Sequence, residues 1–225
     1  MIPTIRRGDP TLRPTTIETR ELWLGWARGG VRLGADYFAE SMRDRIVPAF
    51  DTTESVVSGT EFVFANGDPL RTRGVELEGR MSLGLDHALF GAYTYQAARE
   101  VGAPTLAPDV PRVLFNVGGT LGLTRHLSTT LVVLHRGAVE RAPDDLRRDP
   151  QVAQALGIPL QARVPAHTVA NLNVRLLNVW DTFELAATVD NLFGARYADP
   201  AQANGAPLDY PQPGRAAYLK AGYRF

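Results

Sequence analysis

The chain has 225 residues, equal numbers of acidic and basic side chains, and no cysteine. A neutral chain lacks the basic surface typical of general nucleic-acid binders, so we expect no nucleic-acid partner. The lack of cysteine excludes disulfides, thiolate metal sites and cysteine nucleophiles. No apolar run reaches the roughly 20 residues of a membrane-spanning helix, but a membrane β-strand needs only about 9–11 residues of alternating character.

Apolar and polar residues alternate with a period of two along most of the chain, and helical periodicity is nearly absent. Several of these runs are longer than typical globular strands, and twelve residues at about 3.3 Å each reach about 40 Å. A strand of that length, tilted by about 45°, crosses a bilayer core of about 30 Å. Pro69 predicts a bulge or break in the third run, because proline donates no ladder hydrogen bond. We predict about nine strands, at residues 15–27, 30–43, 60–83, 87–98, 111–123, 126–140, 165–177, 181–193 and 214–225.

The predicted strands have two chemically distinct faces. In 165–177, the apolar residues Ala170, Leu172, Val174 and Leu176 alternate with Asn171, Asn173 and Arg175. In 181–193, they are Phe183, Leu185, Ala187 and Val189, alternating with Glu184, Ala186, Thr188 and Asp190. A soluble sandwich also has an apolar and a polar face, so this alternation alone does not decide the fold.

The lengths of the connections favour one architecture. Short turns near 29–30, 84–86, 124–126 and 178–181 alternate with long segments at 44–59, 99–110, 141–164 and 194–213. In an antiparallel meander every second connection lies on the same side, and outer-membrane barrels combine short periplasmic turns with long outer loops. Sandwich connections do not keep this pattern. The chain is therefore predicted to be all-β, an antiparallel transmembrane β-barrel meander, with its four long segments outside the cell as candidate ligand-binding loops.

Aromatic residues gather near the two predicted rims. Trp26, Trp180 and Tyr223 fall near the short-turn side, and Tyr37, Tyr93, Tyr95 and Tyr197 fall nearer the long-loop side. Such rings favour the headgroup level of a membrane, although each could singly be an ordinary core residue. The last strand follows the same pattern: Leu219, Ala221, Tyr223 and Phe225 are predicted to face lipid, and Lys220 and Arg224 a wet lumen.

The segment PDDLRRDPQVAQALGIP is the one candidate helix, with a cap near Asp144 or Asp149. Arg147 and Arg148 within it, and Arg141 just before it, could attract an anionic ligand. The alternative, a solvated loop face, is the interpretation that we favour.

The sequence offers little support for catalysis or metal binding. The four histidines, His87, His126, His135 and His167, are dispersed without metal-ligand spacing. Glu76 and Glu78 share a face, which fits charge in a barrel lumen beside Arg80 better than an acid–base pair. No glycine-rich loop joins a strand to a helix, so nucleotide binding has no support. We predict no enzyme activity, no cofactor and no metal site.

Four ordered stretches contain motifs of a known family: GDPTLRPTTIETRELWLGW, FANGDPLRTRGVELEGRMSLG followed by FGAYTYQAA, TVDNLFGARYADP, and YPQPGRAAYLKAGYRF. With them the chain resembles the C-terminal part of the barrel of TonB-dependent outer-membrane receptors of the siderophore-receptor type. Two positions depart from the family pattern. Thr15 or Thr16 stands where glutamate is usual, and Lys220 stands where the assembly signal often has glycine.

The resemblance implies energy-coupled uptake of a scarce, bulky ligand across the bacterial outer membrane, most often a ferric siderophore. Haem, cobalamin and glycans are other ligands of the family. It implies contact with outer-membrane lipid, recognition of the C-terminal signal Tyr223 and Phe225 by the barrel assembly machinery, and coupling to the TonB complex through a plug. Residues 1–225 are expected to form the C-terminal portion of a 22-stranded barrel, without the plug.

Nine strands alone are not expected to make a transporter. If the first and last strands of a nine-stranded meander met, they would pair in parallel, whereas bacterial single-chain barrels have even strand numbers. A tenth strand within residues 1–14 is disfavoured by Pro3, Pro10 and Pro14. We therefore expect a fragment that functions only when another chain supplies the missing strands. A soluble β-sandwich binding module and a small passive outer-membrane pore remain as alternatives.

Overall fold

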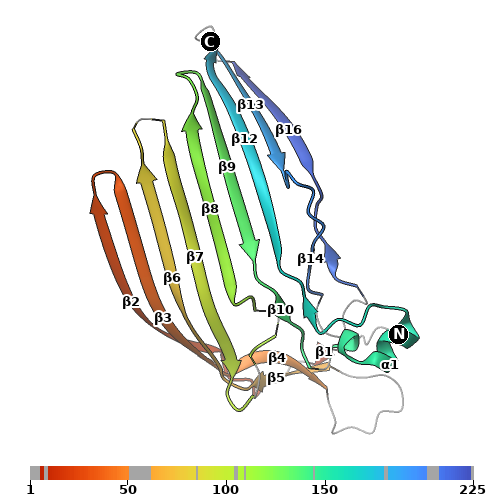
Figure 1. The fold of residues 1–225 in the computed structure, drawn as a ribbon. Helices are drawn as coiled ribbons and strands as arrows, with labels where there is room; N and C mark the ends of the chain where they lie inside the picture. The colour runs from red at the N-terminus through yellow and green to blue at the C-terminus, as the bar shows by residue number, and fades with distance from the viewer. Residues whose placement is uncertain are drawn as a thin grey trace. The chain divides into compact units, whose positions relative to one another are not determined.

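In a computed structural model, the structure describes residues 6–7, 10–50, 62–84, 86–103, 106–108, 110–143, 145–179, 182–201 and 208–223. Nine long strands form one sheet in the order β16-β13-β12-β9-β8-β7-β6-β3-β2, so that strands adjacent in this order are hydrogen-bonded (Figure 1). They are β2 (Thr16–Arg28), β3 (Val31–Arg43), β6 (Leu70–Ser82), β7 (Ala88–Glu100), β8 (Val113–Gly122), β9 (Leu127–Arg136), β12 (His167–Val179), β13 (Phe183–Asp190) and β16 (Ala216–Tyr223). The predicted nine-stranded antiparallel meander is confirmed.

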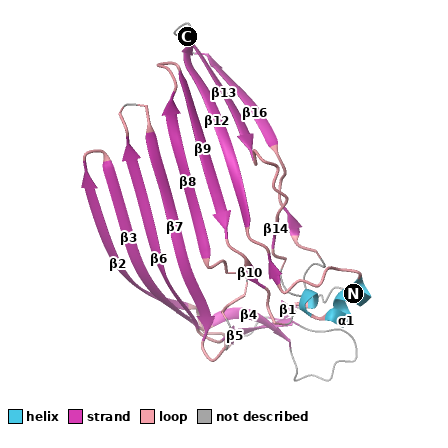
Figure 2. Ribbon diagram, viewed as in Figure 1, coloured by secondary structure: helices cyan, strands magenta, loops and turns pink. Residues whose placement is uncertain are grey.

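The remaining elements are short, and Figure 2 shows how little of the described chain is helical. A three-stranded sheet has the order β1-β5-β4, with β1 (Arg6–Arg7), β4 (Arg45–Phe50) and β5 (Phe62–Gly67). Two further pairs are β10 (Val139–Glu140) with β11 (Arg163–Val164), and β14 (Ala198–Asp199) with β15 (Tyr210–Pro211). The helices are η1 (Leu146–Arg148) and α1 (Pro150–Leu156). The described residues contain no helix that is both long and apolar enough to span a membrane.

Three boundaries differ from the sequence-based expectation. The break at Pro69 is confirmed, but β5 before it leaves the nine-stranded sheet and pairs with β4. Residues 45–50, predicted to belong to a long loop, therefore form a strand. The predicted strand 126–140 ends at Arg136, and residues 139–140 pair instead with β11. Among the described residues no second large sheet packs on the first, so the soluble-sandwich alternative has no support.

The chain divides into two compact units, which we describe separately. The first comprises residues 1–21, 38–73 and 97–107. In it the amide of Asn66 donates to the carbonyl oxygens of Arg13 and Asp44, at 2.8 and 2.9 Å. Arg45 and Glu100 form an ion pair at 2.5 Å. These contacts fasten the β4–β5 hairpin within this unit.

The second unit comprises residues 22–37, 74–96 and 108–225. Its short turns β2–β3, β6–β7 and β8–β9 lie at one end of the sheet, as the connection lengths predicted (Figure 1). The first turn consists of Gly29 and Gly30, whose φ angles are 56° and 82°. Positive φ at both central residues is the requirement of the tight hairpin turn that matches strand twist.

Strand register keeps the two faces of the second unit distinct, because directly opposite residues share a face. On one face apolar residues oppose one another: Leu172 with Leu131 and Val189, Leu185 with Leu176 and Ala221, and Leu219 with Ala187. On the other face Asn173 opposes Thr130 and Thr188, and its amide donates to the Thr188 hydroxyl at 2.7 Å. The predicted division of these strands into an apolar and a polar face is confirmed.

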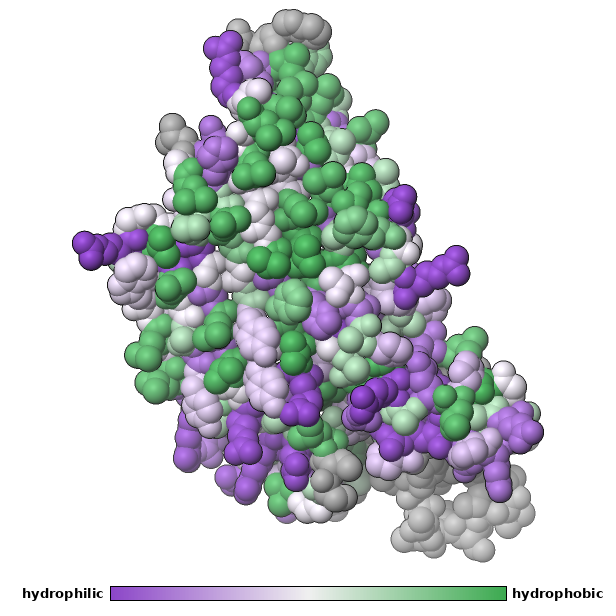
Figure 3. All heavy atoms as spheres, viewed as in Figure 1, coloured by the Kyte–Doolittle hydropathy of each residue, from purple (hydrophilic) through white to green (hydrophobic). Residues whose placement is uncertain are grey.

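The apolar face is largely uncovered in the described structure. Leu185 is 46% exposed and Leu219 is 89% exposed. Figure 3 shows apolar side chains gathered over the part of the sheet formed by β9, β12 and β13. Water-soluble monomers rarely expose apolar patches of this kind, so the face requires an apolar environment.

Candidate functional site

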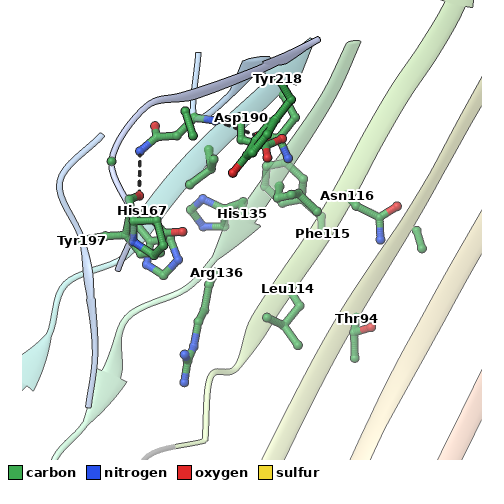
Figure 4. Close-up of a pocket in the computed structure, with 18 residues that line it drawn as sticks. Thr94, Leu114, Phe115, Asn116, His135, Arg136, His167, Asp190, Tyr197 and Tyr218 are labelled. Atoms are coloured by element: carbon green, nitrogen blue, oxygen red, sulfur yellow. Dashed lines mark hydrogen bonds between the residues drawn. The ribbon is translucent and has the colours of Figure 1, made fainter. Parts of the chain in front are cut away.

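A groove of about 560 Å³ lies on the polar face of the second unit, near the ends of the strands that lead into long connections (Figure 4). The floor of the groove consists of two rows of residues that lie opposite one another across the neighbouring strands β7, β8, β9 and β12. One row is Ala92, Asn116, Leu134 and Val169, and the other is Thr94, Leu114, Arg136 and His167. Asn171, Asp190, Ala216 and Tyr218 continue the wall on β12, β13 and β16.

Tyr197 and Pro213 of the 194–213 segment form the remaining side of the groove, and Asn191 holds this part of the segment in place. The backbone N–H of Asn191 donates to the Asn171 side-chain oxygen at 2.9 Å. Its own side chain accepts from the Ala195 N–H and donates to the Ala195 carbonyl, both at 2.8 Å. Asn191 has φ of 49°, a left-handed conformation that asparagine tolerates better than most residues. The family-like motif Asn-Leu-Phe therefore has a local structural role.

Two contacts bring this segment against the ends of β9 and β12 that lead into long connections. The ring of Tyr197 stacks on His167, with 4.3 Å between ring centroids. The guanidinium of Arg136 donates to a carboxylate oxygen of Asp199 at 2.5 Å. Figure 4 shows His167 against Tyr197, with Asp190 and Tyr218 near one another and Asn116 and Thr94 on the strands across the groove. The groove thus combines amide, hydroxyl and aromatic groups with a paired cation.

A second polar cluster lies inside the long connections and contains four charged side chains: Arg141, Arg147, Asp145 and Asp209. Arg141 and Arg147 both donate to one oxygen of Asp209, each at 2.9 Å. Arg147 also donates to Asp145 at 2.7 and 2.6 Å. Arg141, Arg147 and Asp145 are buried. The cluster therefore joins the 141–164 segment to the 194–213 segment.

The carboxylates of this cluster stay ionised. Burial raises the pKa of Asp145, but hydrogen bonds from Arg147 outweigh it and hold the pKa below its ordinary value. Burial likewise raises the pKa of Asp209, and hydrogen bonds from Arg141 and from the Ala201 N–H outweigh it. Two cations thus face two anions in a site removed from water, an arrangement in which each charge depends on its partners.

These contacts correct the interpretation of the three arginines. Arg141 and Arg147 neither lie on a solvated loop face nor are available for an anionic ligand, because the carboxylates of Asp145 and Asp209 occupy both. Arg148 is exposed and donates to the Arg141 carbonyl at 3.0 Å. The helix prediction is confirmed: Asp149 caps α1 by accepting from the N–H groups of Gln151 and Val152. Asp144, the other proposed cap, lies outside the described residues.

Each of the four histidines has its own partner, although His135 and His167 line the same groove. His87 accepts from the Gly122 N–H at 3.2 Å, and His126 pairs with the Leu177 carbonyl. His135 pairs with the Thr168 hydroxyl and stacks on Phe115. In the described part of the chain no group of three or more potential ligands could hold a metal ion.

The predicted C-terminal signal is described only in part. Tyr223 packs against Phe183 across the β13–β16 pair, with 5.0 Å between ring centroids, and is exposed. Trp26, Tyr37, Tyr93 and Tyr95 are exposed as well. Phe225, Trp180 and Arg224 lie outside the described residues, so their predicted positions are not tested.

The predicted ligand-binding segments differ in how much of them is described. Residues 51–59 of 44–59, part of 99–110 and residues 202–207 of 194–213 lie outside the described residues. The 141–164 segment contains η1 and α1, and the 194–213 segment contains β14 and β15. Sequence reasoning missed Asp199 and Asp209 as arginine partners. No sequence signal marks them, because each lies more than 60 positions from its arginine.

We compared the chain with known proteins to find which family it matches. The sequence model of one family, described as TonB dependent receptor-like, beta-barrel, matches residues 2–192. Among curated proteins, none matches this sequence.

Solved structures match the fold closely at low sequence identity. The ferric enterobactin receptor of Pseudomonas aeruginosa, solved with enterobactin, has a TM-score of 0.73 and 19% identity over 96% of this chain and 32% of its own. The siderophore receptor of Acinetobacter baumannii has a TM-score of 0.71 and 20% identity over 98% and 33%. A copper transporter has a TM-score of 0.72 and 17% identity over 97% and 34%. The chain spans about a third of the length of these structures.

Proposed function

This chain belongs to the family of TonB-dependent receptor-like β-barrels, and from this premise we propose that it forms nine strands of the wall of an outer-membrane transporter together with several of its outer loops. The family consists of outer-membrane transporters rather than enzymes. In this proposal the apolar face contacts lipid, and the polar face with its groove lines the lumen.

The observation that carries the proposal is the uncovered apolar face opposite a hydrogen-bonded polar face. In a membrane barrel the lipid-facing residues alternate with lumen-facing ones along every strand. The rows that contain Leu172, Leu185 and Leu219 follow this rule across β9, β12, β13 and β16. The exposed aromatic residues near the strand ends suit the two headgroup levels.

The sheet has two edge strands, and in a membrane these edges need further strands to pair with. β2 and β16 form the edges of the described sheet. Within hydrocarbon each unpaired backbone group costs several kcal/mol, so an open sheet is not stable there. We propose that other strands, from the same or another chain, close the barrel, and that a plug carried with them contacts the TonB complex. Assembly would use the barrel assembly machinery, which recognises the strand that ends in Tyr223 and Phe225.

We propose that the transported ligand is a ferric siderophore. The groove lies at the end of the sheet that leads into the long connections, where a ligand from outside the cell would arrive. Its amide, hydroxyl and aromatic groups can hold a bulky ligand by many weak contacts. The ligands named for similar structures include both a siderophore and copper, so the choice among ligands needs its own test.

The test is iron uptake in the bacterium that encodes the chain. A strain with the gene deleted is compared with the same strain carrying the gene on a plasmid, using siderophores loaded with radioactive iron. The proposal expects the plasmid to restore uptake and a protonophore to abolish the restored part. Restored uptake that survives the protonophore would favour a passive pore. Unchanged uptake of every iron complex on deletion would rule out a siderophore transporter.

A further inference from the structure

The groove is nearly neutral, and this restricts the ligand. Among the described residues that line it, Arg136 is the one lysine or arginine, and its guanidinium is paired with Asp199 at 2.5 Å. Asp190 brings a carboxylate without an ion-pair partner in the described part of the chain. The described lining of the groove therefore has no unpaired lysine or arginine to offer an anion.

The buried charge cluster in the long connections of the same unit does not supply the missing positive charge. Arg141 and Arg147 are buried against Asp145 and Asp209, so the four formal charges of that cluster cancel. A multiply charged anion that entered the groove would lose water without gaining a charged partner there, and Asp190 would repel it. The remaining lining residues offer the Asn116 amide, the Thr94 and Tyr218 hydroxyls, and the rings of Tyr197, His135 and His167, none of them a lysine or arginine (Figure 4).

The charge of an iron complex depends on its chelating groups. Three catecholates contribute six negative charges, so their complex with Fe³⁺ is a trianion. Three hydroxamates contribute three, so their complex is neutral, and its carbonyl and amide groups match uncharged hydrogen-bonding partners. We propose that this wall takes a neutral iron chelate of the hydroxamate type and discriminates against trianionic catecholate complexes.

This inference rests on the proposed function and differs from the ligand named for one similar structure, the ferric enterobactin receptor. The difference is compatible with the shared fold, because a barrel scaffold does not fix the chemistry of its ligand. Discrimination arises from the balance of paired and unpaired charges at the site.

The experiment uses the deletion strain with two probes: ferrichrome, a neutral ferric trihydroxamate, and ferric enterobactin, a ferric tris-catecholate. The inference expects the plasmid-borne gene to restore energy-dependent uptake of ferrichrome and to leave ferric enterobactin unchanged. Restored uptake of ferric enterobactin, or equal restoration of both, overturns the inference and leaves siderophore transport standing. Restoration of neither overturns this inference, and siderophore transport falls with it only if deletion leaves the uptake of every iron complex unchanged.

Two variants test whether charge is the cause. Asp199→Asn leaves Arg136 without its carboxylate, and one charge-assisted hydrogen bond gained by an anionic ligand should raise ferric enterobactin uptake relative to ferrichrome by about 10-fold. Asp190→Asn removes the unpaired negative charge and should act in the same direction. The matched control is Asp86→Asn, which makes the same charge change at an exposed position near a short turn. Selectivity that stays unchanged in both groove variants, with normal amounts of protein in the membrane, contradicts the inference.

Discussion

Asp209→Asn should release the 141–164 segment from the 194–213 segment. Asp209 accepts hydrogen bonds from Arg141, Arg147 and the Ala201 N–H. Asparagine keeps the shape of the side chain and removes its charge, which leaves two buried guanidinium groups facing the single carboxylate of Asp145. Removing one partner of a buried ion pair costs about 3–5 kcal/mol. This free energy should appear as local opening, because the cluster lies in the long connections and not in the sheet.

Trypsin gives a direct assay, because it cleaves after arginine and two of the arginines are buried in this cluster. When opening is fast, the cleavage rate follows the population of the open form. A cost of about 3–5 kcal/mol, at tenfold per 1.4 kcal/mol, raises cleavage after Arg141 and Arg147 by about 100-fold to several thousand-fold. The measurement is made on isolated outer membranes, with cleavage sites identified by mass spectrometry.

Glu140→Gln is the matched control. It breaks the exposed ion pair between Glu140 and Arg163, whose atoms are 2.6 Å apart at the base of the same connection. Exposed pairs contribute at most about 1 kcal/mol, so cleavage should rise by no more than about fivefold. Equal cleavage rates in wild type and Asp209→Asn, or an equal rise in both variants, would refute the reasoning about buried charge.

Three further predictions concern pH, lipid contact and sidedness. The pKa values of Asp145 and Asp209 lie below their ordinary value, so the cluster should stabilise the connections fully above about pH 4 and lose this effect as the pH falls further. Hydrogen exchange of the backbone amides in these connections, corrected for the intrinsic exchange rate at each pH, measures this loss. Leu185→Arg should destabilise the assembled barrel by about 2–4 kcal/mol if it lies near the membrane midplane, whereas Asn173→Ser should cost about 1 kcal/mol for the lost hydrogen bond. Denaturant titrations measure both costs, and equal values would reject the assignment of the two faces. A cysteine at exposed Gln154 should react with an impermeant maleimide on intact cells and one at Asp86 should not, and the reverse result would invert the topology.

Features that depend on neighbouring residues could be predicted from the sequence. The alternation in β12 and β13, the Gly29–Gly30 turn and the Asp149 cap before Pro150 each arise within a few positions, where backbone sterics and local hydrogen bonds decide the outcome. The break at Pro69 was equally local.

Features that depend on distant residues could not be predicted. Arg141 lies 68 positions from Asp209, and Arg136 lies 63 positions from Asp199. Nothing in the sequence around an arginine says which distant carboxylate it meets, so a buried pair and a solvated charge look alike. The pairing of β5 with β4 could not be predicted for the same reason. The alternation in residues 62–67 fits a strand of either sheet equally well.

The central claim is that one face of this sheet contacts lipid and the other contacts water. The chain has no native cysteine, so single spin labels can be attached at successive positions 170–176 and examined by electron paramagnetic resonance in outer membranes. The account predicts that collisions with oxygen, which concentrates in lipid, peak at Ala170, Leu172, Val174 and Leu176. Collisions with a water-soluble nickel complex should peak at Asn171, Asn173 and Arg175. Equal accessibility along the strand, or peaks in the opposite phase, would contradict the claim that this chain forms the wall of an outer-membrane barrel.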